Sequence, residues 1–524
     1  MSAQDEEEIT EEGERAIKSV AKGAGIVLMG IVFSKLAGYA YNIIAARYLG
    51  ADGYGLVSLA AAVMSFVSVF CILGLNHGIN RYASFYKGKG NEERTKGSIF
   101  SGLKIIFGAT LIVTIALFLA SDFIATVVFN EPGTALVFRL FALTLPFYVF
   151  IKGFVSVTDA YQKMKYRAIS RDILMKGTKA LLVFVFVVFL GLDVLGVAYA
   201  YLISYILGAS AIAYFVAAKI LPKLRDVVPK PNYRELLAYS WPLLLASVMG
   251  KVLSKTDQIM LGYFLDSGQV GIYRASLLTA AFLTVVLTAL RKITLPVLSD
   301  LIGKESTEEF NRTFKTAIKW AFSATLPLFV VLVLFAPQVL DLIFGAEYVA
   351  GATALSILAV THFVKVCFGL SSSLLKSVEK TKLILVATDS SGLINIFLNI
   401  LLIPMYGMVG AAAAYFISIF LLYSLYMFFG HKHLRTNPFK LSIIKSLVAA
   451  LLSALPIYIL FRHLLAPVRT WMFPVAFFLY LGLYTLLFLV MKGLDSEDIL
   501  VLKAVERKTG LRIEWLRNFI KRFL

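Results

Sequence analysis

Long apolar runs recur along the whole chain, and they constrain its fold more than any other feature of the sequence. Residues 24–46 and 136–158 are two examples, and each is longer than the roughly 20 residues that a helix needs to cross a bilayer. Charged residues make up 16% of the chain, against about 25% in soluble domains. This leaves too little polar surface to cover a water-soluble globule. The sequence therefore predicts an all-α polytopic membrane protein.

The apolar runs predict fourteen transmembrane helices. They are expected at residues 24–46, 56–77, 98–119, 136–158, 173–190, 195–217, 237–261, 270–292, 316–335, 353–375, 383–402, 408–429, 443–461 and 472–490. The chain has two cysteines, Cys71 and Cys367, and both lie in apolar runs. Two cysteines are too few for a cysteine-based metal site, and neither a metal nor a cofactor is expected.

Lysine and arginine concentrate in the loops that follow even-numbered helices. The loop RYASFYKGKGNEERTKG, at 81–97, is rich in both, whereas segments 121–134 and 336–350 contain neither. Because cytoplasmic loops are enriched in these residues, both termini are predicted to face the cytoplasm. Most of the net charge of +19 comes from the lysine and arginine residues of these loops. It is spread over many loops rather than gathered on one face, which argues against a nucleic-acid partner.

The sequence contains an internal repeat. GVAYAYLIS at 196–204 returns as GAAAAYFIS at 410–418, and residues 34–55 align without gaps with 250–271. The similar offsets of these pairs predict two lobes of six helices each. Since six is even, the lobes would be parallel and related by a pseudo-two-fold axis along the membrane normal, as in many transporters.

The repeat and the charge pattern together predict the domain organisation. The expected parts are an acidic cytoplasmic tail (1–22), an N-lobe (23–218), a cytoplasmic linker (219–236), a C-lobe (237–430), two further helices (443–491) and a basic amphipathic cytoplasmic tail (495–524).

Several basic residues fall inside the predicted helices. A lysine at the bilayer centre costs about 3 kcal/mol on insertion scales, so most are expected to face a water-filled cavity or an anionic partner. Helical spacing places Lys35, Tyr39 and Asn42 on one face of the first helix. Lys251, Lys255 and Gln258 take the matching place in the seventh helix. The residues predicted to bind substrate are Lys35, Tyr39, Asn42, Lys152, Lys251, Lys255, Gln258, Arg274 and Lys365.

Long basic side chains can also reach from a helix end to the membrane surface. This alternative applies to Lys152 and Arg274, which lie toward helix ends, and it accounts for Lys176 and Lys179. Inside the helices the balance of charge is cationic. It therefore favours an anionic substrate, and phosphate fits this charge best.

Acidic residues are scarcer within the predicted helices. Asp257 and Asp389 are candidates for coupling transport to an ion gradient, either of H⁺ or of Na⁺. An ion pair with a neighbouring lysine is the alternative for each. Pro146, Pro242 and Pro327 also lie inside helices, where a proline permits a kink that suits a rocking helix.

The chain resembles the MOP superfamily, and within it the polysaccharide-transporter, Wzx-type branch. The resemblance is carried by the fourteen helices, the two lobes, the basic residues of the first and seventh helices, and the stretch GLNHGINRYASFYKGKG at 74–90. It implies a V-shaped transporter, monomeric in the plasma membrane, that alternates between inward-open and outward-open states. It also implies flipping of a polyprenyl-(pyro)phosphate-linked oligosaccharide from the inner to the outer leaflet, for cell-surface polysaccharide or glycoprotein glycan assembly. Tyr39, Asn42, Gln258 and Tyr273 would then hydrogen-bond sugar, and the basic residues would pair with phosphate.

The sequence leaves three alternatives open. Peptidoglycan-precursor flippases share the fourteen helices and a cationic cavity. MATE-type drug or small-solute antiporters share the lobes, but they bind cations and would favour a more acidic cavity. A membrane-embedded glycosyltransferase would need catalytic carboxylates, and the loops contain no DxD motif. Since HExxH and P-loop motifs are also absent from the sequence, we expect a transporter rather than an enzyme.

Overall fold

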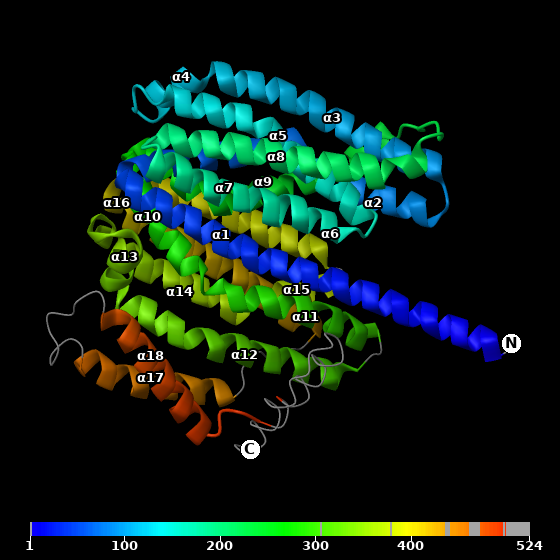
Figure 1. Ribbon diagram of the computed structural model, residues 1–524. Helices are drawn as coiled ribbons and strands as arrows, with labels where there is room; N and C mark the ends of the chain where they lie inside the picture. The colour runs from blue at the N-terminus through cyan, green and yellow to red at the C-terminus, as the bar shows by residue number, and fades with distance from the viewer. Residues whose placement is uncertain are drawn as a thin grey trace. The chain divides into compact units, whose positions relative to one another are not determined.

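The computed structural model describes residues 3–303, 306–377, 380–434, 441–460, 472–495 and 498, and within them it contains helices and no strands (Figure 1). The α-helices are α1 (Ala3–Ile72), α2 (Leu75–Gly88), α3 (Glu92–Leu119), α4 (Ser121–Phe123), α5 (Ala135–Ala160), α6 (Met164–Arg167), α7 (Lys176–Val183), α8 (Val194–Lys219), α9 (Tyr233–Phe264), α10 (Ser267–Ala281), α11 (Thr284–Gly303), α12 (Thr307–Leu334), α13 (Ala336–Phe344), α14 (Ala352–Phe368), α15 (Ser371–Ser377), α16 (Thr381–Leu434), α17 (Leu441–Ile459) and α18 (Met472–Val490). Short π or 3₁₀ segments are η1 (Ile124–Val128), η2 (Ala168–Met175), η3 (Phe184–Phe189), η4 (Leu221–Leu224) and η5 (Ala346–Gly351). The all-α prediction is confirmed for this part of the chain.

Two compact units make up the chain. Unit 1 comprises Met1–Lys255 and Asp266–Gly268, and unit 2 comprises Thr256–Leu265 and Gln269–Leu524. The first part of α9 therefore belongs to unit 1, although the repeat assigns α9 to the second lobe. Of the two predicted tails, 3–22 forms the beginning of α1, and 499–524 lies outside the described residues.

Nine helices in the described part of the chain are long and apolar enough to cross a membrane. The number is ten if α10 and the start of α11, which meet at an angle of 48°, form one span. This is fewer than the fourteen predicted. Two of the nine are far longer than one crossing requires, because Val32–Ile72 has 41 residues and Lys382–His433 has 52.

Both long helices break at a glycine. Gly50 in α1 has φ 68° and Gly407 in α16 has φ 56°, and the left-handed region favours glycine because a Cβ is strained there. A third such glycine, Gly191 (φ 61°), precedes α8. It lies 216 positions before Gly407, which is the offset at which residues 34–55 align with 250–271.

The predicted fifth helix, 173–190, is not a regular α-helix. The structure has α6, η2, α7 and η3 in succession, with π-type turns over Ala168–Met175 and Phe184–Phe189. A π turn accommodates an extra residue and so rotates the following residues to another face. No single α-helix here is long enough to count as a span.

In unit 1, α5 packs between α3 and α8 (Figure 1). The segment before α9 is held against the start of α3. The Lys230 amide donates to the Glu93 carbonyl (3.0 Å), and the Lys96 ammonium donates to the carbonyls of Leu224 and Val227 (2.8 Å each). Gly97 faces this segment at close range.

We expect Gly97→Ala to destabilise unit 1. The added Cβ would lie 1.8 Å from the Lys230 carbonyl oxygen, so the backbone must shift, at a cost of about 1–3 kcal/mol. Gly108→Ala in the same helix is the matched control. A Cβ at Gly108 meets nothing within 4 Å, and alanine favours a helix over glycine by about 1 kcal/mol. Thermal unfolding should show a lower midpoint for the first variant and an equal or higher one for the second.

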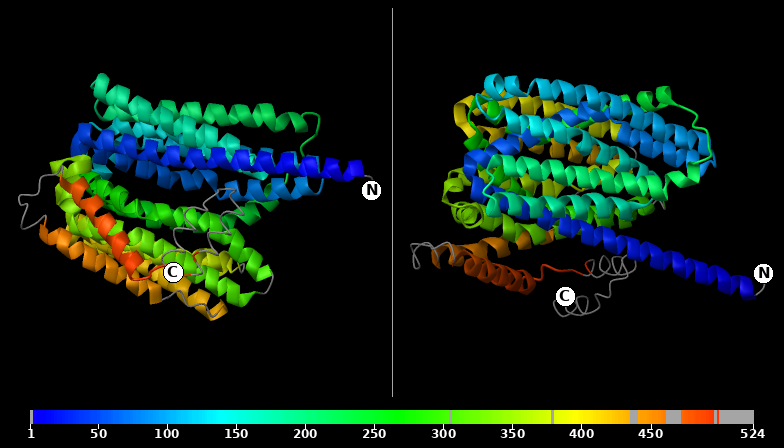
Figure 2. Two further views of the ribbon diagram at one scale, coloured as in Figure 1. Left: turned by 60° about the horizontal axis from the view of Figure 1, so that its bottom comes forward. Right: turned by 45° about the horizontal axis from the view of Figure 1, so that its top comes forward.

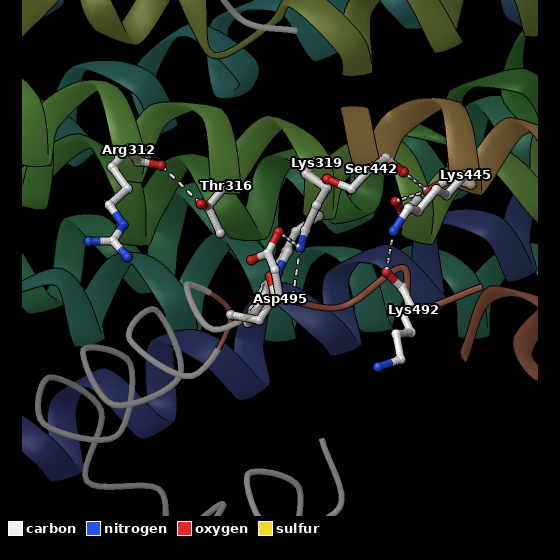
Figure 3. A network of polar contacts seen from close by, with 11 residues as sticks. Arg312, Thr316, Lys319, Ser442, Lys445, Lys492 and Asp495 are labelled. Atoms are coloured by element: carbon white, nitrogen blue, oxygen red, sulfur yellow. Dashed lines mark hydrogen bonds and ion pairs between the residues drawn. The ribbon is translucent and has the colours of Figure 1, made fainter. Parts of the chain in front are cut away.

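In unit 2, α17 and α18 pack against each other and α17 packs against α12 (Figure 2). A buried ionic network adds to this packing (Figure 3). The Lys319 ammonium of α12, only 1% exposed, lies 2.6 Å from Asp498 Oδ2 and 3.1 Å from Asp495 Oδ2. Trp320 Nε1 donates to Asp498 Oδ1 (2.6 Å). The network fixes residues just beyond α18 to the middle of α12.

Candidate functional site

A cavity of ≈ 510 Å³ with charged and polar side chains in its wall lies within unit 1. Residues from the end of α1, from α2, α5 and η2, and from the unit 1 part of α9 line it. Its charged lining residues are Lys152, Asp159, Arg171 and Lys251, and its polar ones include Asn76, His77, Asn80 and Ser156.

Local geometry explains why these side chains meet. On α5, Lys152, Ser156 and Asp159 follow one another at i, i+4 and i+7, so they share one helical face. Between α1 and α2 the backbone turns through Leu73 (φ 53°) and Gly74 (φ 71°). A Cβ on Gly74 would lie 2.5 Å from the Ser240 carbonyl oxygen. Glycine therefore allows α2 and α9 to approach closely enough to form a common wall.

Two lysines carry the positive charge of this cavity. Lys251 Nζ donates to Ser65 Oγ (2.6 Å), which lies 3.5 Å from the Tyr148 hydroxyl. Lys152 Nζ lies 4.2 Å from the centroid of the Tyr148 ring. Within the described ranges neither ammonium forms an ion pair. Tyr148 thus lies between two lysines whose charge no carboxylate neutralises directly.

The other charges of the cavity wall are paired. Arg171 donates to both carboxylate oxygens of Asp172, at 2.9 and 3.2 Å. Asp159 Oδ2 lies 3.3 Å from Arg167 Nη1. An anion in the cavity would therefore be attracted mainly by Lys152 and Lys251.

The predicted residues of the first helix lie elsewhere. Lys35 is exposed on α1, and neither it nor Tyr39 lines the cavity. Asn42 is buried, where it donates to the Gly38 carbonyl (2.6 Å) and accepts from the Tyr54 hydroxyl (2.9 Å). The bond to Tyr54 joins the two parts of α1 that the break at Gly50 separates.

The remaining predicted residues also lie outside this cavity. Lys255 is half-buried on the unit 1 part of α9, and Arg274 is half-buried on α10 in unit 2. Lys365 on α14 donates to the Tyr415 hydroxyl of α16. No observation assigns any of the three to substrate, and their roles stay predictions.

A second polar cluster is buried in unit 2. Asp257 accepts from Asn399 Nδ2 (2.8 Å), Asn395 Nδ2 (3.2 Å) and the Tyr273 hydroxyl (3.0 Å). Gln258 is also buried, and neither of its amide atoms has a hydrogen-bond partner among the described residues. The hydrogen-bond partners of Asp257 are thus neutral donors. The alternative considered from the sequence, an ion pair with a neighbouring lysine, supposed a charged partner. Asp389, on α16, is half-buried.

The position of Lys179 differs from the one predicted from the sequence. We expected it to reach the membrane surface, but its side chain is buried, 5% exposed, in unit 1. Its ammonium lies 3.7 Å from the ring centroid of Tyr41 and 4.2 Å from that of Tyr201, a cation–π arrangement. Lys179 follows the π-type turns of η2, which rotate the residues after them to another face of the helix, and regular helical spacing does not predict such a rotation.

Among the described residues, no group of three or more His, Cys, Asp or Glu could hold a metal ion. Cys71 is buried and Cys367 half-buried, and both are free thiols.

Comparisons with known proteins agree with this architecture. Residues 20–302 match the family model described as polysaccharide biosynthesis protein, and residues 242–401 match the MatE family model. A probable low-salt glycan biosynthesis flippase of Haloferax volcanii is 27% identical over 41% of this chain and 47% of its own length. A putative O-antigen transporter of Shigella flexneri is 22% identical over 72% of this chain and 89% of its own. The lipid II flippase MurJ, in an inward closed conformation, superposes with a TM-score of 0.70 at 15% identity, covering 88% of this chain and 97% of its own.

Proposed function

The chain belongs to the polysaccharide biosynthesis protein family of membrane transporters, and from this premise we propose that it flips a polyprenyl-(pyro)phosphate-linked oligosaccharide from the inner to the outer leaflet. The observation that carries the proposal is the cavity of unit 1, where Lys152 and Lys251 present two ammonium groups without ion-pair partners in the described ranges. The sugar and phosphate would enter this cavity while the lipid tail stays in the bilayer.

The chemistry of the cavity suits such a head group. Ammonium groups bind phosphate through charge-assisted hydrogen bonds, and the hydroxyl, amide and imidazole groups of Ser156, Asn80 and His77 suit a sugar. A cavity for organic cations would instead need an excess of carboxylates. The relatives named for glycan or O-antigen transport support the same substrate class.

We further propose that the chain crosses the membrane fourteen times. Val32–Ile72 and Lys382–His433 each count as two crossings separated by Gly50 or Gly407. The bent pair α10–α11, the shorter helix α18 and the segment α6–η3 each add one to the remaining helices. Six crossings then precede α9, six run from α9 to α16, and α17 and α18 follow. The matching glycines Gly191 and Gly407 support a repeated plan of two parallel lobes. From the loop charges and the family we propose that both termini lie in the cytoplasm and that the transporter alternates between the leaflets.

Transport can be tested with purified protein in liposomes. The measurement is the fraction of a fluorescent polyprenyl-diphosphate-linked saccharide that an impermeant quencher reaches from outside. We expect protein-containing liposomes to exchange the lipid between leaflets faster than empty ones. If exchange is not accelerated while a cationic dye is moved across, the chain is a small-solute antiporter instead.

Asp257 is our candidate for the coupling-ion site. It is buried among Asn395, Asn399 and Tyr273, and the amide oxygens of asparagine can join a carboxylate in binding Na⁺ when the amides turn. We expect Na⁺, compared with choline at equal ionic strength, to raise the thermal midpoint by about 3 °C, since an ion that binds the folded state stabilises it. Asp257→Asn should abolish the increase and Asp389→Asn should preserve it. An increase that survives in Asp257→Asn would contradict this assignment.

A further inference from the structure

One feature of the unit 1 cavity does not suit an anion site, namely the carboxylate of Asp159 in its wall. A carboxylate repels phosphate, so its presence lowers the affinity of the cavity for a simple phosphate. Asp159 therefore needs another explanation than phosphate binding, and its position on α5 suggests one.

The charged groups of the cavity wall lie at two heights along the axis of α5. Lys152 and Asp159 share one face of α5 and are seven residues apart, which is about 10 Å along a helix axis. Lys251 contacts Ser65, Ser65 lies beside Tyr148, and Lys152 lies over the Tyr148 ring. Both ammonium groups therefore lie at the same height along α5, which we call the Lys152 level. Ser156 lies one turn from Asp159 on that face, and Asn80 and His77 of α2 line the same cavity.

The carboxylate of Asp159 has unused hydrogen-bonding capacity. Its Oδ2 lies 3.3 Å from Arg167 Nη1, while its Oδ1 is buried without a hydrogen-bond partner in the described part of the chain. An ionised carboxylate can accept about four hydrogen bonds, and leaving a buried acceptor unsatisfied costs roughly 1–3 kcal/mol. Rotation of the carboxylate toward the cavity would let a ligand donor satisfy it.

We infer that Asp159 is a specificity-determining residue that accepts hydrogen bonds from hydroxyl or amide donors of the substrate's glycan, while Lys152 and Lys251 hold the phosphate. The inference rests on the proposed function and deepens it. A diphosphate-linked sugar carries an anionic group and a donor-rich ring side by side, which matches a wall with ammonium groups at one level and a carboxylate at the other. Asp159 thus selects the glycosylated lipid over the bare lipid phosphate.

The alternative is that Asp159 only neutralises Arg167. The two accounts predict different effects of Asp159→Asn on the preference for glycosylated over bare lipid. As a counter-ion alone, its loss would increase the attraction for every anionic lipid equally. As a glycan acceptor, its loss would remove the same repulsion from both lipids but would also weaken a charge-assisted hydrogen bond that only the glycosylated lipid makes, so the preference for that lipid should fall.

The test measures dissociation constants of the full-length protein in lipid nanodiscs for two probes with the same tail, polyprenyl diphosphate and polyprenyl-diphosphate N-acetylglucosamine. For Asp159→Asn we expect the preference for the glycosylated probe to fall about tenfold, with bare probe binding equally well or more tightly. Asp122→Asn is the matched control, since Asp122 also pairs with an arginine of unit 1, Arg139, but does not line the cavity. It should leave both constants unchanged.

The outcomes separate the inference from the function on which it rests. If Asp159→Asn strengthens the binding of both probes by the same factor, or changes neither dissociation constant, Asp159 does not contact the glycan. The inference is then wrong, while the flippase proposal stands. If the unaltered protein binds neither probe, the proposed function fails first. Melting curves of each variant confirm that binding is measured on folded protein.

Discussion

Replacing Lys152 and Lys251 together by methionine is expected to lower the affinity for polyprenyl diphosphate at least 100-fold and to abolish lipid exchange in liposomes. Both ammonium groups line the cavity of unit 1 without ion-pair partners in the described residues. A hydrogen bond to a charged group contributes about 1.5–3 kcal/mol, so two of them amount to a factor of 100 or more in the dissociation constant. Methionine keeps an unbranched apolar side chain of similar size and removes the ammonium group, that is, the charge and its N–H donors together.

The matched control is Lys104→Met, because Lys104 is an exposed lysine of α3 in the same unit and does not line the cavity. It should bind and transport normally. Replacement of Lys152 and Lys251 by arginine keeps both charges and should retain part of the activity. Full exchange activity in the double methionine variant, at equal protein incorporation, would show that the cavity does not bind the phosphate.

The second large effect is expected from Lys319→Met in unit 2. Removing this ammonium leaves Asp498, which is fully buried, and Asp495 without their cation (Figure 3). Breaking a buried ion pair in this way costs about 3–5 kcal/mol, which corresponds to a fall of roughly 10 °C in the thermal midpoint. The chain beyond α18 should also become more sensitive to protease.

Lys445→Met is the control for this prediction. Lys445 donates to the Lys492 carbonyl (3.0 Å), an exposed hydrogen bond to the same part of the chain (Figure 3), and its loss should lower the midpoint by less than about 2 °C. Equal midpoints for Lys319→Met and the unaltered protein would mean that the buried network does not hold this segment.

Much of the helical framework could be predicted from the sequence, because a membrane span needs a continuous apolar run and such runs are visible without a structure. The predicted helix at 98–119 falls within α3 (Glu92–Leu119), and 195–217 falls within α8 (Val194–Lys219). The predicted membership of the MOP superfamily is confirmed by the family matches. The prediction for 173–190 was less accurate, because π turns leave no trace in hydrophobic periodicity.

The candidate site was predictable only in part. Lysines inside apolar helices are conspicuous, so Lys152 and Lys251 were identified from the sequence, and the structure places both on one cavity. Asp159 was overlooked because it lies one residue beyond the predicted helix at 136–158, where a charge is unremarkable; α5 extends to Ala160. Residue spacing along α1 shows which side chains share a face, but not whether that face is buried or exposed. The exposure of Lys35 and the burial of Asn42 depend on tertiary packing.

We propose that this chain binds a lipid-linked saccharide through the lysines of its unit 1 cavity. The most direct measurement is native mass spectrometry of the purified protein after incubation with a lipid extract of its own host. We predict a retained adduct with the combined masses of a polyprenyl phosphate or diphosphate and sugars, absent from the Lys152 and Lys251 double methionine variant. Retention of ordinary phospholipids alone, alike in both proteins, would contradict the claim.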